Sequence, residues 1–201
     1  MGSQFQEKNQ SLLTDRFVQA FEYAFTLHKF QKRKGTNIPY FSHLMAVAAL
    51  VSEDGGDEDQ VIAAILHDAV EDHGGYKTLS EIHQMFGERV ADIVEDCSDS
   101  FSQPKPPWEN RKKEYLLHLK SASPEARRVS LADKLHNARS ILRDLDSFGD
   151  SVWERFNGGK EGTLWYYQSL SEIFNFEQDG SMAVEFKNLV SQITERSRRN
   201  Q

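Results

Sequence analysis

Apolar residues recur every three or four positions along most of this chain, a spacing that places them on one face of an α-helix. Phe17, Phe21 and Ala24 are one example. The pattern predicts helices over residues 14–32, 40–52, 59–72, 78–86, 88–98, 108–120, 123–146, 160–175 and 181–196. Between the last long helix and the two C-terminal ones, residues 148–159 are expected to be irregular or weakly helical.

Prolines, glycines and capping residues mark the ends of these helices. Residues 34–39 and 98–107 are predicted loops, the second because it holds three prolines. Pro124 suits the first turn of the long helix, and Thr78 with Glu81 predicts a capping box. No segment alternates apolar and polar residues with the period of a strand. The fold class is therefore expected to be all-α, a compact multi-helix pack.

The segment 61–73, with the sequence VIAAILHDAVEDH, interrupts an apolar pattern with ionisable groups. On a continuous helix His67 lies above Glu71, and Asp68 lies above Asp72. Burying unpaired charge is costly, so such a cluster needs a partner. A metal ion with a reactive water fits these residue types best. The alternative is a helix end that simply emerges into solvent at Asp68.

Two further polar residues occur in apolar helices elsewhere and could complete a metal site. They are His43, within PYFSHLMAVAALV, and Asp133, within RRVSLADKLHNARSIL. Together with His67 and Asp68 they form a mixed nitrogen and oxygen set, which suits Mn²⁺ or Fe²⁺ better than structural zinc. His43 could instead be a core histidine bonded to a carbonyl, and Asp133 could be an exposed partner of Lys134.

Length, charge and cysteine content restrict the number of domains, the class of ligand and the compartment. The 201 residues suit one domain, and the net charge of −7 argues against general binding to nucleic acid or anionic membranes. Basic clusters at 28–34 and 111–113 still leave room for a small phosphorylated ligand. The single cysteine, Cys97, excludes an internal disulfide and fits a reducing compartment. With a polar N-terminus and no apolar run of membrane-spanning length, a cytoplasmic protein is expected.

The order His, His-Asp, Asp resembles the HD-domain metal-dependent phosphohydrolases. The segments RKGTNIPYFSHLMAVA, ILHDAVEDH and VSLADKLHNAR are most similar to the hydrolase domain of RelA/SpoT-type proteins, and among these to the small alarmone hydrolases of the Mesh1 type. The resemblance covers about residues 15–145. It implies a single HD hydrolase domain over 1–201, with the helices of about 150–196 packed on that core.

The resemblance also implies which residues bind the metal and which act on the attacking water. Glu71 and Asp72 match the pair that orients and activates the attacking water. The ion would be Mn²⁺, or another divalent ion, held by His43, His67, Asp68 and Asp133.

The implied substrates are alarmones of the guanosine 3′,5′-bis(diphosphate) type, which would lose their 3′-pyrophosphate to give pyrophosphate and GDP, or GTP where the 5′ end is a triphosphate. Arg33 and Lys34 match the basic pair that lines the nucleotide site. Asn137 and Ser140 match polar positions that contact the nucleotide, although the family usually has Thr where Ser140 stands.

Departures from the family pattern leave alternatives open. His73 replaces the usual Thr, and the loop before His43 is one residue longer, so the base is not settled by the sequence. An adenosine alarmone, NADPH, a 5′-nucleotide or a non-catalytic nucleotide sensor remain alternatives, as does a purely structural helical protein. A two-metal phosphodiesterase would need further ligands, for which His83 and His118 are available. The oligomeric state is not predicted, and the aromatic residues 165–167 could close the pocket or belong to the core.

Overall fold

The computed structural model describes residues 12–102 and 104–199, and the polar segment at the N-terminus lies outside these ranges. Within them the chain is helical without strands, as predicted. The helices, in order, are α1 (Asp15–His28), α2 (Phe41–Glu53), α3 (Glu58–Leu66), α4 (Ala69–Asp72), α5 (Tyr76–Phe86), α6 (Glu88–Cys97), α7 (Trp108–Leu119), α8 (Pro124–Phe148), the 3₁₀ helix η1 (Gly149–Arg155), α9 (Gly159–Ile173) and α10 (Phe176–Arg199).

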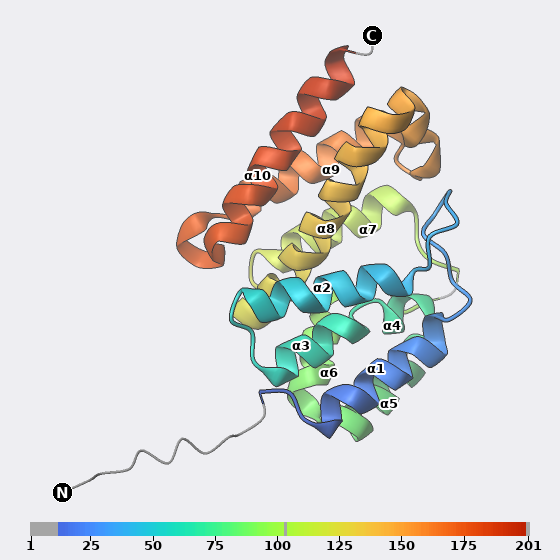
Figure 1. Ribbon diagram of the computed structural model, residues 1–201, viewed down its shortest axis with the longest axis vertical. Coiled ribbons are helices and arrows are strands. Elements are labelled where there is room, and N and C mark those ends of the chain that lie inside the picture. Colours follow the sequence, from blue (N-terminus) through green and yellow to red (C-terminus); the bar gives the residue numbers. More distant parts are fainter. Residues whose placement is uncertain (1–11, 103, 200–201) are drawn as a thin grey trace, which may run out of the picture.

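Helix α8 connects two groups of helices (Figure 1). One group holds α1 to α6, and the other holds α7, α9 and α10. Helix α10 lies along the length of α8, and α9 packs against α7, η1 and α10. The buried face of α8 includes Leu131, Leu135 and Ala138, each fully inaccessible to solvent. Burial of this apolar face, at about 25 cal/mol per Å², holds both groups on one helix. The same helix can therefore present side chains to both groups.

Helix ends agree with the expected chemistry in most places. Thr14, Asp57 and Ser123 each cap a helix by accepting a bond from a backbone N–H in the first turn. The region expected to be irregular, 148–159, holds η1. The last helix is longer than predicted, because helical backbone geometry continues on both sides of a kink at Gly180, where φ is 66°.

Three local predictions were wrong. The helix predicted over 14–32 ends at His28, and Lys32 pairs with Pro39 in an isolated β-bridge. The helix predicted over 59–72 breaks after Leu66 and resumes as α4 at Ala69. The capping box at Thr78 and Glu81 does not form, because α5 already begins at Tyr76. Instead, the Thr78 hydroxyl donates to the carbonyl of His73, and Glu81 accepts a 2.6 Å bond from the Tyr23 hydroxyl.

A glycine in the turn before α5 brings the proline-rich loop close to α4. Gly75 has φ of 58°, and a Cβ there would collide with the carbonyl oxygen of Phe101. Tyr76 stacks on the Phe101 ring with centroids 4.8 Å apart. The loop that follows Phe101 is therefore held against the end of α4. No helix in the described ranges is long and apolar enough to cross a membrane.

A buried ion pair fastens α8 to the C-terminal helices. Arg127 donates to both carboxylate oxygens of Asp179 at 2.8 and 2.6 Å, and also to the carbonyls of Leu119 and Ile173. The two side chains are 8% and 2% exposed. Removing one partner from such a pair leaves the other charge buried without compensation.

Arg127→Met is therefore expected to lower the free energy of unfolding by about 3–5 kcal/mol, measured by urea denaturation. The matched control is Arg139→Met. Arg139 bonds Glu185 at 2.8 and 2.9 Å, but both side chains are nearly half exposed, so its loss should cost at most about 1 kcal/mol. Equal effects of the two substitutions would contradict the role given to the buried pair.

Candidate active site

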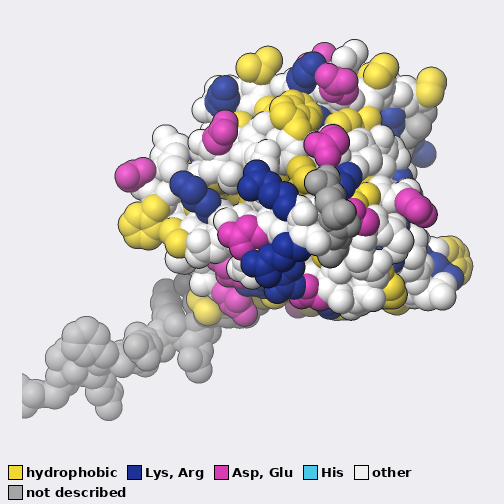
Figure 2. Space-filling view, turned by 90° about the horizontal axis from the view of Figure 1, so that it is seen from above, with side chains coloured by type: hydrophobic (Ala, Val, Ile, Leu, Met, Phe, Trp, Pro, Cys, Tyr) yellow, Lys and Arg dark blue, Asp and Glu magenta, His cyan; other side chains and the backbone are white. Residues whose placement is uncertain are grey.

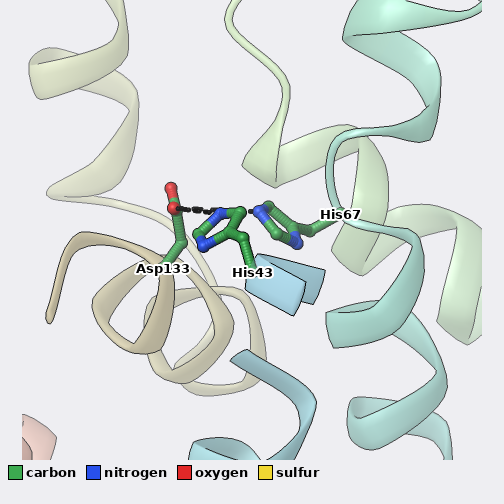
Figure 3. A group of neighbouring side chains, drawn as sticks. All are labelled: His43, His67 and Asp133. Atoms are coloured by element: carbon green, nitrogen blue, oxygen red, sulfur yellow. Dashed lines mark ion pairs between the residues drawn. The ribbon is translucent and has the colours of Figure 1, made fainter. Parts of the chain in front are cut away.

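Three of the predicted metal ligands converge between α2, α3 and α8. Ligand atoms of His43, His67 and Asp133 all lie within 4.8 Å of one another, and all three residues are buried. Figure 3 shows the His43 ring between the other two side chains. His43 Nε2 is 3.1 Å from Asp133 Oδ1, and His67 Nε2 is 3.8 Å from the same oxygen.

The outer nitrogens of both imidazoles are occupied, which turns their inner nitrogens toward this point. His67 Nδ1 contacts the carbonyl of Ala64 at 2.8 Å, so Nδ1 carries a proton and Nε2 is the nitrogen that faces the group. His43 Nδ1 lies 2.7 Å from Nδ1 of His136. The Nε2 atoms of His43 and His67 are buried and have no hydrogen-bond partner. Two imidazole nitrogens that make no hydrogen bond of good geometry and lie 2.9–3.8 Å from carboxylate oxygens are the donor set that a divalent ion needs.

Asp68, the fourth predicted ligand, lies at the edge of this group. It occupies the break between α3 and α4, and its Oδ2 is 2.9 Å from His67 Nε2 and 3.8 Å from His43 Nε2. The same oxygen accepts a 2.5 Å bond from the Tyr40 hydroxyl. The break in the helix thus lets Asp68 reach the imidazoles, and Tyr40 sets the direction of its carboxylate.

The surrounding charges favour a cation at the centre. Burial would raise the pKa of Asp133, but Lys134, 2.5 Å away, and the two imidazoles hold that pKa well below its ordinary value. Burial lowers the pKa of His43. Burial also opposes a charge on His67, yet Asp68 and Asp133 outweigh it and raise the pKa of His67 well above its ordinary value. The carboxylates are therefore ionised, and positive charge is stabilised between them.

Glu71 and Asp72 follow in α4, where side chains from the proline-rich loop and α7 meet them. Lys105 Nζ is 2.9 Å from Glu71 and 3.3 Å from Asp72, and Arg111 is 3.6 Å from Glu71. Burial and the nearby Asp99 carboxylate raise the pKa of Glu71. A carboxylate with a raised pKa is a better proton acceptor than an exposed one.

A cavity of about 360 Å³ adjoins the metal ligands. All four residues predicted to bind substrate, Arg33, Lys34, Asn137 and Ser140, line it. Its remaining lining is mainly basic and aromatic, and includes Tyr40, Trp108, Lys112, Lys134, Arg143, Arg155, Phe156, Tyr166 and Tyr167. This volume is within the range of small-molecule sites, and the lining suits a ligand with phosphates and a ring.

Several side chains in the cavity wall are already oriented. Arg33 donates to Asn137 at 2.7 Å, and its guanidinium is 5.8 Å from the Tyr40 ring centroid. The hydroxyls of Thr163 and Tyr166 are buried without hydrogen-bond partners. Polar atoms of this kind at a cavity wall are available to a ligand.

Other histidines predicted as alternatives lie elsewhere. His83 is exposed in α5, and His118 is exposed in α7 and contacts Asp96 at 3.0 Å. Neither joins the metal group in the described part of the chain. Of the aromatic stretch 165–167, Tyr166 and Tyr167 are buried beside the cavity, and Trp165 is half-buried and packs on Trp108.

Figure 2 shows the molecule from the upper end of Figure 1. On this face, positively and negatively charged side chains are mixed. Dark-blue and magenta groups alternate there with apolar ones, so this face is not uniformly basic.

Sequence reasoning missed several residues that hold the site together. Tyr40, Gln31, Lys105 and His136 contact predicted ligands or the Glu71–Asp72 pair. Lys105 and Gln31 lie in or beside loops, where side-chain direction is not periodic. Of these, only His136 could have been suggested by the sequence, since it is a further polar residue in the apolar segment that holds Asp133.

Solved structures with the same architecture include that of a metazoan orthologue of SpoT described as hydrolysing ppGpp and acting in starvation responses. It matches with a TM-score of 0.75 and 22% sequence identity, over 91% of this chain and 98% of that chain. The protein lmo0812 of Listeria monocytogenes EGD-e matches with a TM-score of 0.67 and 31% identity, over 76% and 99% of the two chains. These likenesses support the all-α fold.

Sequence comparisons point to the same group. The guanosine-3′,5′-bis(diphosphate) 3′-pyrophosphohydrolase MESH1 of Xenopus tropicalis is 39% identical over 159 residues, which are 78% of this chain and 81% of that protein. A family model described as an HD domain matches residues 20–164, a range that contains the histidines and aspartates of the metal group. The chain therefore belongs to the HD-domain family.

Proposed function

We propose that this chain is a metal-dependent hydrolase that removes the 3′-pyrophosphate of guanosine 3′,5′-bis(diphosphate). The observation that carries the proposal is the position of Asn137 on α8. Its amide donates to Asp133 Oδ1 at 2.5 Å, and its own oxygen accepts from Arg33 at 2.7 Å. The metal group and the basic cavity are therefore adjacent and share one helix. The named activity of the Xenopus relative supports this substrate.

The ligands proposed for the ion are His43, His67, Asp68 and Asp133, and Mn²⁺ is the proposed ion. Two imidazoles and two carboxylates suit a borderline divalent ion with positions left for water. Such an ion lowers the pKa of a coordinated water.

Glu71 and Asp72 are proposed to act on the attacking water. Glu71, with its raised pKa, accepts the proton as the water oxygen bonds to the phosphorus next to the ribose 3′ oxygen. The bond between that phosphorus and the 3′ oxygen breaks, the 3′ oxygen takes up a proton, and GDP and pyrophosphate result. Lys105 and Arg111 lie where they offset negative charge at this pair.

The cavity is proposed to hold the rest of the nucleotide. Arg33 and Lys34 supply positive charge for phosphate oxygens, and Asn137 and Ser140 supply polar contacts. The aromatic wall that includes Tyr40 offers ring faces to the base and ribose. His73 does not line the cavity among the described residues, so its difference from the family pattern does not by itself favour another base.

Mn²⁺ at about 100 times its Kd is expected to stabilise the protein by about 2.7 kcal/mol, a rise in Tm of roughly 5–10 °C for a chain of this size. Asp133→Asn should abolish most of that rise, because it removes a charged ligand while keeping the side-chain shape. The control is Asp57→Asn, a residue that caps α3 and is 53% exposed and whose replacement still caps. Differential scanning fluorimetry with and without Mn²⁺ measures this. An equal rise in all three proteins would contradict the proposed ligand set.

With Mn²⁺ present, the protein is expected to release GDP and pyrophosphate from guanosine 3′,5′-bis(diphosphate). Chromatography of products from a panel with the adenosine 3′-pyrophosphate analogue, NADPH and 5′-nucleotides identifies the preferred substrate. Glu71→Gln should reduce kcat about 10²–10⁴-fold and keep the Mn²⁺-dependent rise in Tm. Glu109→Gln, at an exposed residue of α7, should change neither. Turnover of Glu71→Gln at the parent rate would show that Glu71 does not act on the water.

A further inference from the structure

Behind Asp72, on the side away from Lys105, a layer of three polar side chains joins α1 to α4. Gln31 Nε2 donates to Asp72 Oδ2 at 2.8 Å. Gln31 Oε1 contacts His28 Nδ1 at 2.6 Å and His73 Nε2 at 3.2 Å. His28, Gln31 and His73 are here called the Gln31 layer. The metal and the proposed water-activating step do not use any of its members.

The hydrogen-bonding capacities of these groups permit one arrangement. An ionised carboxylate only accepts, so the Gln31 amide nitrogen must face Asp72. Its carbonyl oxygen then faces both histidines, and each must present an N–H to it. Gln31 thus links two imidazole donors to one carboxylate, and rotation of its amide would break all three bonds.

Packing and backbone bonds hold the layer in place. His28 is only 1% exposed, stacks on the Tyr40 ring at 5.5 Å, and meets the His73 ring edge to face at 4.5 Å. The Gln31 backbone is also bonded on both sides, to the His28 carbonyl and to the Tyr40 amide, at 2.9 Å each. The layer bonds Asp72 directly, and it contacts Tyr40, whose hydroxyl bonds the proposed metal ligand Asp68.

We infer that Gln31, held by His28 and His73, is a positioning residue that fixes the carboxylate of Asp72 for the reaction. Asp72 Oδ2 accepts a hydrogen bond from Gln31, and Asp72 Oδ1 accepts one from Lys105 at 3.3 Å. Asp72 therefore cannot rotate freely about its terminal bond. His73, the residue that differs from the family pattern, acts on Asp72 through Gln31. This inference rests on the proposed function, because it assigns Asp72 a part in turnover.

The test is Gln31→Met, which keeps the length of the side chain and removes its hydrogen bonds. Because displacement of a catalytic group by about 1 Å can cost about 10²-fold, kcat should fall about 10- to 100-fold. KM and the Mn²⁺-dependent rise in Tm should stay within about twofold of the parent, since this variant leaves the proposed metal ligands and the residues proposed to hold the nucleotide unchanged. The matched control is Gln19→Met, the same change at an exposed position of α1.

A double-mutant cycle separates positioning from a structural role. If Gln31 acts through Asp72, Gln31→Met should cause no further loss of kcat in an Asp72→Asn background. A role in folding alone would lower Tm and leave the kcat of the folded protein unchanged. His73→Ala should lose several-fold in kcat, and His73→Gln, which retains an N–H donor, should recover much of that loss.

The outcomes distinguish this inference from the proposed function. If the parent releases no product from any substrate of the panel, the proposed function fails and this inference fails with it. If the parent is active and Gln31→Met has the parent kcat, or if the two losses simply add in the cycle, only the positioning role is overturned. If Gln31→Met does not fold, His73→Ala and His73→Gln test the positioning role instead, because they alter a half-buried side chain. Parent kcat in His73→Ala would then overturn that role.

Discussion

The burial of ionisable groups between α2, α3 and α8 is the constraint on which the rest of the site depends. His43, His67 and Asp133 are withdrawn from water in a core of Leu, Ile, Val and Ala side chains. Water cannot solvate these groups, so they must satisfy one another or bind a cation. The outer nitrogen of each imidazole is already engaged. The unmet bonding capacity therefore points inward, to a single location.

Helix α8 places the buried metal group next to the cavity. Asp133 faces the metal group, and Asn137, one turn later, faces the cavity. The C-terminal helices contribute to the site by holding α8 through Arg127 and by placing Tyr166 and Tyr167 in the cavity wall. The proline-rich loop contributes in a similar way, because contact with Gly75 brings Lys105 to Glu71 and Asp72. Segments distant in sequence thus supply charge to one small region.

Much of this could be predicted from the sequence because the signals are periodic or compositional. Helical spacing indicated an all-α fold, and polar residues in apolar helices marked His43, His67 and Asp133. The break at His67 and Asp68 could not be predicted, since the apolar pattern continues through it and the break is stabilised by tertiary contacts such as the bond from Tyr40 to Asp68. Similarly, Thr78 has the spacing of a cap, but its hydroxyl finds the carbonyl of His73 in the preceding turn.

The sequence by itself determined the helical class, the HD-type motif and the candidate ligands, because each follows from residue type and spacing along the chain. Only the tertiary structure decided which side chains meet. It brought Arg33 to Asn137, Gln31 to Asp72 and His43 to His136, pairs separated by 104, 41 and 93 positions. These contacts depend on how helices pack and how loops turn, and a linear pattern does not encode the direction of a side chain across such distances.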